Sequence, residues 1–593
     1  MERKDVETKY TWDLTPIFPS DEAWEAEFKA FEKDFENSGI SSYQGTLGDK
    51  QKLLGFFALR DALSRRLEKL YLYASMRHDE DIRVSKYTSY TAMMSSLVSR
   101  LMAEMAFVEP ELTSLDDSVL KAYIDDPAFS AYDYTLDLIR RSKEHVLGEG
   151  EEKLLALASD VMGGFQGVFS MLDNANLNLP KGEFNGEEVQ MSHGLYGLVL
   201  HSGKREEREK WFKAYYAAYI RLIDAITQTY YGNVKKDIFY KTARKYDTCM
   251  AMAMAGEDVS PAVYNNLIES VHAAFPAMHR YISLRRELLG LEEQHMYDIY
   301  VPLVSDADIK LPFEEAYELV IKGLAPLGKD YQALLRRGKD ERWIDVYETE
   351  GKRSGAYSTG VYDTHPYVLL NYQQTTNEIF TIAHEMGHSI HTYKSTEAQP
   401  YTKSEYTIFL AEIASTVNEV LLLKYLYSTT EDKQLKKYLL NYYMDMIRTT
   451  LFRQTQFAEF EQIAHAKAES GEPLTKENLC EVYYGLNKQY YGEGIVHDEE
   501  ISYEWARIPH FYRSFYVYKY ATGIISAISI VKRILSEGEP AVKDYFSFLS
   551  GGNCTDPVSI LKRAGVDLTT RAPFETAMKE FGDTLDEFEK LVK

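Results

Sequence analysis

The chain has 593 residues, and its 91 acidic side chains outnumber its 67 basic ones, which gives a formal charge of −24 at pH 7. This length suggests several lobes around one or more large cores, and a content of 45% hydrophobic and 27% charged residues is that of an ordinary globular protein. The excess of negative charge argues against a nucleic-acid partner and against an anionic membrane surface, because both would be repelled.

The chain shows no targeting segment that we can recognise. Its first residues, MERKDVETKYTWDL, contain no apolar run, and the longest apolar stretch, Ala521–Val531, is well short of the ~20 residues of a membrane span. The three cysteines lie far apart and include no CxxC pair, which is typical of a reducing compartment. We therefore expect a soluble cytoplasmic protein without a membrane partner.

The N-terminal part is predicted to be helical. Aromatic side chains at positions 24, 28, 31 and 35 recur at helical spacing and predict a helix over Ala23–Phe35 with a buried face. Similar patterns predict helices within Gln51–Ser75 and Tyr90–Phe107.

The first interruption of the helical pattern is Asn174–Gly194. Turn residues at 180–182 and at Asn185-Gly186 bracket short polar segments, which predicts a β-hairpin. We place a domain boundary at this hairpin, between an N-terminal helical lobe of residues 1–195 and a catalytic domain of residues 196–593. The segment Gly197–Lys204 lacks the spacing of a phosphate-binding loop and is predicted to be a turn before a helix that starts near Glu206.

A second irregular stretch, Trp343–Tyr372, is predicted to form a small sheet. Its β-branched and aromatic segment His365–Tyr372 is expected to be a strand, and Pro366 favours an edge position for it. The glycines within Gly351–Gly360 suggest a mobile flap.

The segment Thr375–His391 carries the clearest chemical signal. Thr375 and Glu378 have the spacing of a capping box, which predicts a helix start. His384 and His388 then project from one face, one turn apart, as two imidazoles must to share a zinc ion. Glu385 lies beside them and can take a proton from a zinc-bound water. Glycine within a helix is unfavourable, so Gly387 suggests that another element packs very close.

A catalytic zinc site needs a third protein ligand. Ser404–Tyr427 is predicted to be a strongly apolar helix that contains Glu412 and Glu419 on nearly the same face. A carboxylate on an apolar face is costly unless it is paired or binds a metal. Glu412 is therefore our candidate third ligand, and Glu419 a candidate partner that orients an imidazole.

These motifs resemble a known family. HEMGH at 384–388 followed by FLAEIASTVNE at 409–419 is similar to the thimet-type (M3) zinc oligopeptidases, and the segments at 10–18 and 510–523 are similar to the bacterial oligoendopeptidase F subgroup within it. The resemblance runs nearly end to end. It implies a mainly α fold with two helical lobes around a deep substrate channel and a small β-sheet next to the HExxH helix.

The resemblance also implies a set of roles. It implies one zinc ion per chain held by His384, His388 and Glu412, Glu385 as general base, and short peptides as substrates. An extended substrate is expected to pair, backbone to backbone, with the edge strand at His365–Tyr372.

The late segment 510–523 adds candidate hydrogen-bond donors. His510, Tyr512, Tyr516 and Tyr518 could stabilise the oxyanion that forms at a peptide carbonyl, and Tyr512 and Tyr516 are expected to share a helical face. The resemblance implies that a histidine and tyrosines of this region hold the substrate, but the alternative, aromatic packing, stays open for each tyrosine. Nine tyrosines fall within residues 483–520, and we expect some of them to line the channel.

The sequence therefore predicts a zinc-dependent endopeptidase that hydrolyses short oligopeptides. One alternative is a metallocarboxypeptidase of related helical fold, for which Arg513 would have to capture the substrate carboxylate. Another is a zinc-binding scaffold without catalysis. Peptide length, residue preference and oligomeric state are not predicted.

Overall fold

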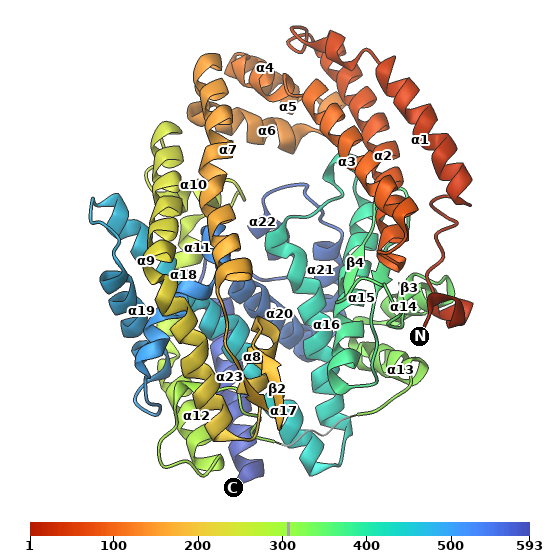
Figure 1. Cartoon of the computed structure of the whole chain (residues 1–593). Coiled ribbons are helices and arrows are strands. Elements are labelled where there is room, and N and C mark those ends of the chain that lie inside the picture. Colours follow the sequence, from red (N-terminus) through yellow and green to blue (C-terminus); the bar gives the residue numbers. More distant parts are fainter. Residues whose placement is uncertain (305–308) are drawn as a thin grey trace. The chain divides into compact units, whose positions relative to one another are not determined.

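The computed structural model describes residues 1–304 and 309–593. It is mainly helical, as predicted, and its strands form two small sheets (Figure 1). The described residues cluster into two compact units. Unit 1 comprises Met1–Val146, Asp308–Leu426 and Ile530–Val566, and unit 2 comprises Leu147–Ala307, Tyr427–Ser529 and Asp567–Lys593.

Both units combine segments that are distant in the sequence. The boundary between them falls inside two helices, α16 (Ile408–Thr429) and α20 (Tyr518–Glu537). The division into residues 1–195 and 196–593 is a different partition, because it follows the order of the chain, and it stays a prediction.

Among the described residues, unit 1 contains eleven further α-helices and a three-stranded sheet. These are α1 (Asp21–Glu36), α2 (Lys50–Glu80), α3 (Ser85–Glu104), α4 (Val108–Ser114), α5 (Asp117–Ile124), α6 (Asp133–Ser142), α13 (Phe313–Gly323), α14 (Lys329–Asp340), α15 (Thr376–Ala398), α21 (Glu539–Leu549), α22 (Pro557–Arg563), β3 (Ile344–Asp345), β4 (Tyr357–Thr359) and β5 (Tyr367–Leu369).

The described part of unit 2 contains ten further α-helices and a hairpin. These are α7 (Glu149–Met171), α8 (His193–Leu200), α9 (Arg205–Ala243), α10 (Cys249–Ala255), α11 (Pro261–Ala273), α12 (Phe275–Leu288), α17 (Lys433–Ile447), α18 (Arg453–Glu469), α19 (Lys476–Tyr491), α23 (Ala572–Val592), β1 (Lys181–Phe184) and β2 (Glu187–Gln190).

The first three helices pack side by side as the aromatic pattern of the sequence requires (Figure 1). All four predicted aromatic side chains of α1 are buried. The Trp24 ring stacks on Tyr90 of α3 with ring centroids 3.9 Å apart, and its indole N–H donates to the carbonyl of Leu70 in α2 at 2.9 Å. The hydrophobic face predicted for Ala23–Phe35 is confirmed.

The hairpin predicted within Asn174–Gly194 is confirmed. Strands β1 and β2 pair antiparallel across Asn185 and Gly186, whose φ angles of 53° and 86° are those of a two-residue hairpin turn. The turn predicted at Gly197–Lys204 is only partly correct. Residues 197–200 form the last turn of α8, and the chain turns only between Leu200 and the start of α9.

The predicted edge position of His365–Tyr372 is wrong. In the sheet of unit 1 the strand order is β3-β5-β4, so β5, which lies within that segment, is the central strand. Pro366 is tolerated because β5 begins one residue later, at Tyr367. The strand with an unpaired edge beside the helix of the histidine motif is β4, since β4 packs on α15 and pairs only with β5 among the described strands.

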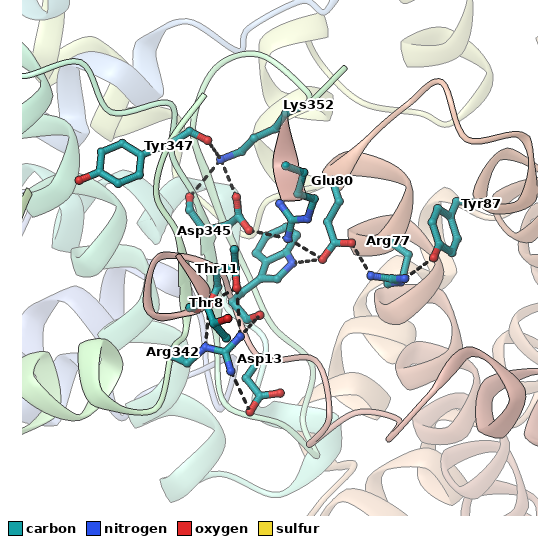
Figure 2. Close-up of polar contacts among 12 residues, drawn as sticks. Thr8, Thr11, Asp13, Arg77, Glu80, Tyr87, Arg342, Asp345, Tyr347 and Lys352 are labelled. Carbon is teal, nitrogen blue, oxygen red and sulfur yellow. Dashed lines mark hydrogen bonds and ion pairs between the residues drawn. The ribbon is translucent and has the colours of Figure 1, made fainter. Parts of the chain in front are cut away.

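A buried ion network ties this sheet to the N-terminus and to the end of α2 (Figure 2). One guanidinium nitrogen of Arg3 lies 2.8 Å from Glu80 and 2.7 Å from Asp345. The Lys352 ammonium lies 2.7 Å from the other oxygen of Asp345. Burial raises the pKa of Asp345, but Lys352 and Arg3 more than offset this effect and hold that pKa below its ordinary value. Trp12 donates to Glu80 at 2.7 Å.

Neighbouring contacts argue against a free flap at Gly351–Gly360. The Gly351 carbonyl accepts from the Ile82 amide at 2.9 Å, and the Asn371 side-chain amide donates to the Gly355 carbonyl at 2.7 Å. The segment then continues into β4, which pairs with β5. Gly351 and Gly355 adopt the positive φ angles that glycine favours in turns, and a mobile flap at this segment stays a prediction.

Within the described ranges, one helix is long and apolar enough, by length and composition alone, to cross a membrane. It is Gly150–Asn176, with a mean hydropathy of 1.3 in its most apolar window, and the chain buries only 11% of that window. It does not stand out in the sequence because glycines and single polar residues interrupt it. One such helix is weak support for a membrane span.

Candidate metal centre

The helix that carries the histidine motif starts where the sequence predicts. The Thr375 hydroxyl accepts from the backbone N–H of Glu378 at 3.3 Å, so it satisfies one of the free amides at the start of α15. Further along the helix, His384 and His388 project from one face. Their ring centroids are 4.8 Å apart, and their two Nε2 atoms are separated by 3.2 Å.

Helix α16 places a carboxylate against both imidazoles. Glu412 Oε2 lies 3.3 Å from His384 Nε2 and 3.4 Å from His388 Nε2. The side chain of Glu412 is 42% exposed, so solvent reaches it. The three predicted metal ligands are therefore brought together, and they form a cluster whose ligand atoms could hold a metal ion.

Gly387 makes this approach possible. A Cβ atom at Gly387 would lie 2.6 Å from Ser415 Cα and 2.7 Å from the Ala414 carbonyl oxygen, both in the backbone of α16. Only glycine fits there. Asn418 fixes the same helix pair, because its side-chain amide donates to the Ala383 carbonyl at 2.9 Å. The close packing inferred from Gly387 is confirmed.

The spacing of the three ligand atoms fits a zinc ion. A tetrahedral ion with bonds of about 2.0–2.2 Å keeps its ligand atoms about 3.3–3.6 Å apart. The three observed separations are 3.2, 3.3 and 3.4 Å. Two imidazoles and one carboxylate leave one of four tetrahedral positions for a water or a substrate.

Glu419 orients His384 from the far side of the ring. Its Oε1 lies 2.6 Å from His384 Nδ1, which leaves Nε2 directed at Glu412 and His388. This contact is the one inferred from the seven-residue spacing on α16. Burial lowers the pKa of His384, but hydrogen bonds to Glu412 and Glu419 more than offset this and raise it to about 10. Burial alone would raise the pKa of Glu412, and the two imidazoles instead hold it well below its ordinary value.

Glu385 lies beside the ligand cluster on α15. Glu385 is only 7% exposed. This burial raises the pKa of its carboxyl group above the ordinary value, although His384 and His388 lower that pKa in part. A carboxylate with a raised pKa is a stronger base than one in water, which suits proton transfer.

The four predicted donors of the late segment lie in unit 2, and the structure separates them into two kinds. His510 is exposed and Tyr516 is half-buried, whereas Tyr512 and Tyr518 are 5% and 1% exposed. The rings of His510 and Tyr516 are nearly parallel, with centroids 6.1 Å apart. Tyr520, which the sequence did not single out, places its hydroxyl 3.4 Å from His510 Nε2.

The prediction that Tyr512 and Tyr516 share a helical face is wrong. Pro509–Tyr512 is a short 3-10 helix, and α20 begins only at Tyr518. Between them Phe515 adopts a φ of 57°, which interrupts any helical pattern. Tyr512 points into the unit and stacks on Phe169 with ring centroids 4.4 Å apart.

Residues that the sequence did not reveal hold this loop. The Ser514 hydroxyl donates to Asp237 at 2.6 Å, and His465 Nε2 lies 3.2 Å from the same carboxylate oxygen. The Phe515 amide donates to Glu461 at 3.1 Å. These partners lie on α9 and α18, 277 and 54 residues away along the chain, so no local spacing could have indicated them.

Most of the tyrosine surplus between 483 and 520 serves packing. Five of the nine are buried, and two of these five bond to buried carboxylates: Tyr483 donates to Glu504 and Tyr490 donates to Glu459. The buried members are Tyr483, Tyr490, Tyr491, Tyr512 and Tyr518. Only the remaining four could meet a peptide.

A helical body with a histidine pair on one helix, a glutamate on the next and a glutamate between the histidines defines the class of peptide-hydrolysing metallopeptidases. The sequence pattern of peptidase family M3 matches residues 198–580, and that of oligopeptidase F matches residues 111–178. The chain belongs to peptidase family M3 and is a peptide hydrolase.

Relatives match over the full length. The chain is 43% identical to oligopeptidase PepF of Bacillus subtilis, over 100% of this chain and 88% of the relative. Among solved structures, a protein from Chlamydophila abortus is 36% identical with a TM-score of 0.94, covering 100% of this chain and 99% of the other. Oligoendopeptidase-F from Enterococcus faecium is 34% identical with a TM-score of 0.74, covering 96% and 99%.

Proposed function

We propose that the chain is a zinc-dependent endopeptidase that hydrolyses short oligopeptides, with one zinc ion held by His384, His388 and Glu412. The observation that carries this proposal is the triangle of ligand atoms with sides of 3.2, 3.3 and 3.4 Å, with the buried Glu385 next to it. When bound there, zinc supplies a Lewis acid that lowers the pKa of a water and polarises a carbonyl.

The side chains of the site then have distinct tasks. Glu385 accepts the proton of the attacking water and passes it to the leaving amine, which a carboxylate of raised pKa can do near neutral pH. Glu419 accepts the Nδ1 proton of His384 and so keeps Nε2 available as a ligand.

The unpaired edge of β4 is the proposed binding place of the peptide backbone. Ser358 in β4 lies against α15, since its hydroxyl is 2.8 Å from that of Ser389, the residue after His388. An extended peptide that pairs with β4 would therefore lie along α15, the helix that carries His384 and His388. Hydrogen bonds to the peptide main chain would give affinity without requiring a particular peptide sequence. This place differs from the strand at His365–Tyr372 that the sequence suggested.

The donors of the late segment stay predictions. Accessibility favours His510 and Tyr516 over the buried Tyr512 and Tyr518 as donors to a substrate carbonyl. A cytoplasmic location also stays a prediction.

The alternative, a metallocarboxypeptidase, would need a cation for the substrate's carboxylate. Arg513 is exposed and its guanidinium lies over the Tyr516 ring at 4.2 Å, so it is available for such a contact.

The two functions are distinguished by digestion of a quenched peptide blocked at both ends, with the metal removed by a chelator and restored as zinc. We expect internal cleavage that is lost and then recovered. Cleavage of only those peptides with a free C-terminus would instead favour the carboxypeptidase.

A further inference from the structure

An apolar cavity opens next to the end of β4, in the same unit as the metal centre. Its volume is about 300 Å³, and its walls come from α2, α3, Tyr401 and the segment after β4. This volume is at the lower end of the range of ligand pockets, so it suits one side chain rather than a whole peptide.

The floor and the rim of the cavity differ. Leu67, Leu72 and Leu101 at its floor are nearly fully buried. At its rim Tyr71 and Met102 are 48% and 64% exposed, although both are large apolar side chains. An exposed apolar rim around a preformed hollow is typical of a surface that a ligand covers.

The alternation of side chains along β4 connects this cavity to the proposed peptide path. The Tyr357 hydroxyl donates to Asp79 of α2 at 2.8 Å, Ser358 contacts α15, and Thr359 again faces α2 and lines the cavity. In a sheet, side chains directly opposite each other on neighbouring strands lie on the same face. A peptide residue paired opposite Thr359 would therefore direct its side chain toward α2 and into the cavity.

We propose that this cavity is a substrate subsite for a large apolar side chain, such as that of phenylalanine, leucine or methionine. The subsite rests on the proposed endopeptidase function. Ser358 contacts Ser389 of α15, and the cavity-lining residues Thr359 and Val361 follow Ser358 by one and three positions in the chain. At ~3.3 Å per residue, the subsite serves a peptide position within about three residues of the one opposite Ser358.

The composition of the walls sets the expected selectivity. Met102 and Met105 are flexible and can adapt to different apolar shapes, so the subsite should select for size and apolarity rather than for one residue. The polar part of the cavity wall includes the Tyr401 hydroxyl, which donates a hydrogen bond to Glu68. The incoming side chain would therefore contact the apolar part of the wall.

The test uses zinc-loaded full-length enzyme and doubly blocked alanine-rich peptides in which Phe, Leu, Gly or Asp is placed at each position in turn. In the wild type we expect Phe or Leu to exceed Gly in kcat/KM by about ten- to hundredfold at one position. Met102→Glu, at the exposed rim, should reduce this ratio at least fivefold, and so should Val98→Trp, which fills the half-buried wall.

The control is Met93→Glu, the same change on the same helix at a residue that is 39% exposed and does not line the cavity. It should leave the ratio unchanged. Cleavage without any positional preference, or a preference that neither Met102→Glu nor Val98→Trp alters, would overturn the subsite but not the endopeptidase. Absence of cleavage of every peptide would overturn both. A change of oligomeric state in Met102→Glu with an unchanged preference would assign the surface to a second copy of the chain.

Discussion

The helix pair α15–α16, whose candidate ligands lie in unit 1, and the loop 509–517 of unit 2 both contain predicted site residues, but only the arrangement on the helix pair could be predicted from the sequence. On α15, a spacing of four residues fixes two imidazoles on one face whatever the surroundings. In the loop, Phe515 leaves the helical region, and contacts to distant helices decide which side chain is accessible. Residue spacing therefore predicts which side chains share a face within a regular helix. It fails where tertiary contacts determine the backbone conformation.

The largest expected effect concerns the close approach of α15 and α16. Gly387→Ala places a methyl group 2.6 Å from the backbone of Ser415, so the helices must separate and Glu412 must leave the imidazoles. We expect a loss of about 1–3 kcal/mol or more in the free energy of unfolding, together with loss of zinc from the purified protein. Urea denaturation and metal analysis measure both.

The matched control is Gly485→Ala, a glycine within α19 around whose Cβ position no atom lies within 4 Å. It should be neutral or stabilising by up to about 1 kcal/mol. Equal behaviour of the two variants would contradict the role given to Gly387.

A second prediction tests the orienting contact within the helix pair. Glu419→Gln removes the charge that holds the Nδ1 proton of His384 at 2.6 Å. We expect zinc affinity to fall about 10–100-fold, as measured by competition with a chromogenic chelator. Glu397→Gln removes an exposed carboxylate from α15 and should leave the affinity unchanged. An unchanged affinity for Glu419→Gln would show that α15 alone orients the ring.

A third prediction tests whether distant contacts position the loop. Ser514→Ala removes the 2.6 Å bond to Asp237, and we expect kcat to fall about tenfold while zinc content and KM change little, since small misplacements are costly in catalysis. Ser536→Ala, which removes a hydroxyl bonded to carbonyls of its own helix, serves as the control. If kcat stays at the wild-type value, the loop is not part of the catalytic machinery.

The last prediction concerns the pH dependence of stability, at the carboxyl group beneath the same loop. Glu461 is fully buried, and burial, with the Asp237 charge in addition, raises its pKa far above the ordinary value, although the Phe515 amide acts in the opposite direction. The folded chain therefore keeps a proton there that the unfolded chain releases above a pH of about 4.3. Its contribution to stability is complete below that pH and is lost progressively as the pH rises toward the folded pKa.

Glu461→Gln keeps an acceptor for Phe515 but cannot ionise. We expect the free energy of unfolding to decline less steeply as the pH rises above about 4.3 in this variant, by up to about 1 kcal/mol per pH unit relative to the wild type. Urea titrations at several pH values measure the slope, with the exposed Glu477→Gln as control. Identical slopes in the variant and the wild type would mean that Glu461 is ionised in the folded protein.

The sequence predicted the elements that depend on repeated spacing. The aromatic face of α1, the Asn185-Gly186 hairpin and the close packing at Gly387 follow from local rules and are found in the structure. Strand order does not follow from such rules, because β5 acquires its central place only when β3 and β4 pair on either side of it.

The candidate site also contains some features that follow from local spacing and others that depend on tertiary contacts. The cluster of His384, His388 and Glu412 was predictable because both helices are regular and apolar around these side chains. Which of the tyrosines are accessible could not be predicted. Composition alone cannot distinguish an accessible hydroxyl from a buried one that bonds to a carboxylate, such as the hydroxyl of Tyr490. Ser514 and Asp237 carry no sequence signal, because their contact joins residues 277 positions apart.

The central claim is that Glu385 acts as the base beside a zinc ion that other residues hold. The most direct test is Glu385→Gln, compared with the wild type for zinc content and for cleavage of a doubly blocked quenched peptide. We predict about one zinc per chain in both proteins and a loss of at least about a thousandfold in kcat for the variant. A variant that keeps its zinc and cleaves the peptide at the wild-type rate would contradict the account.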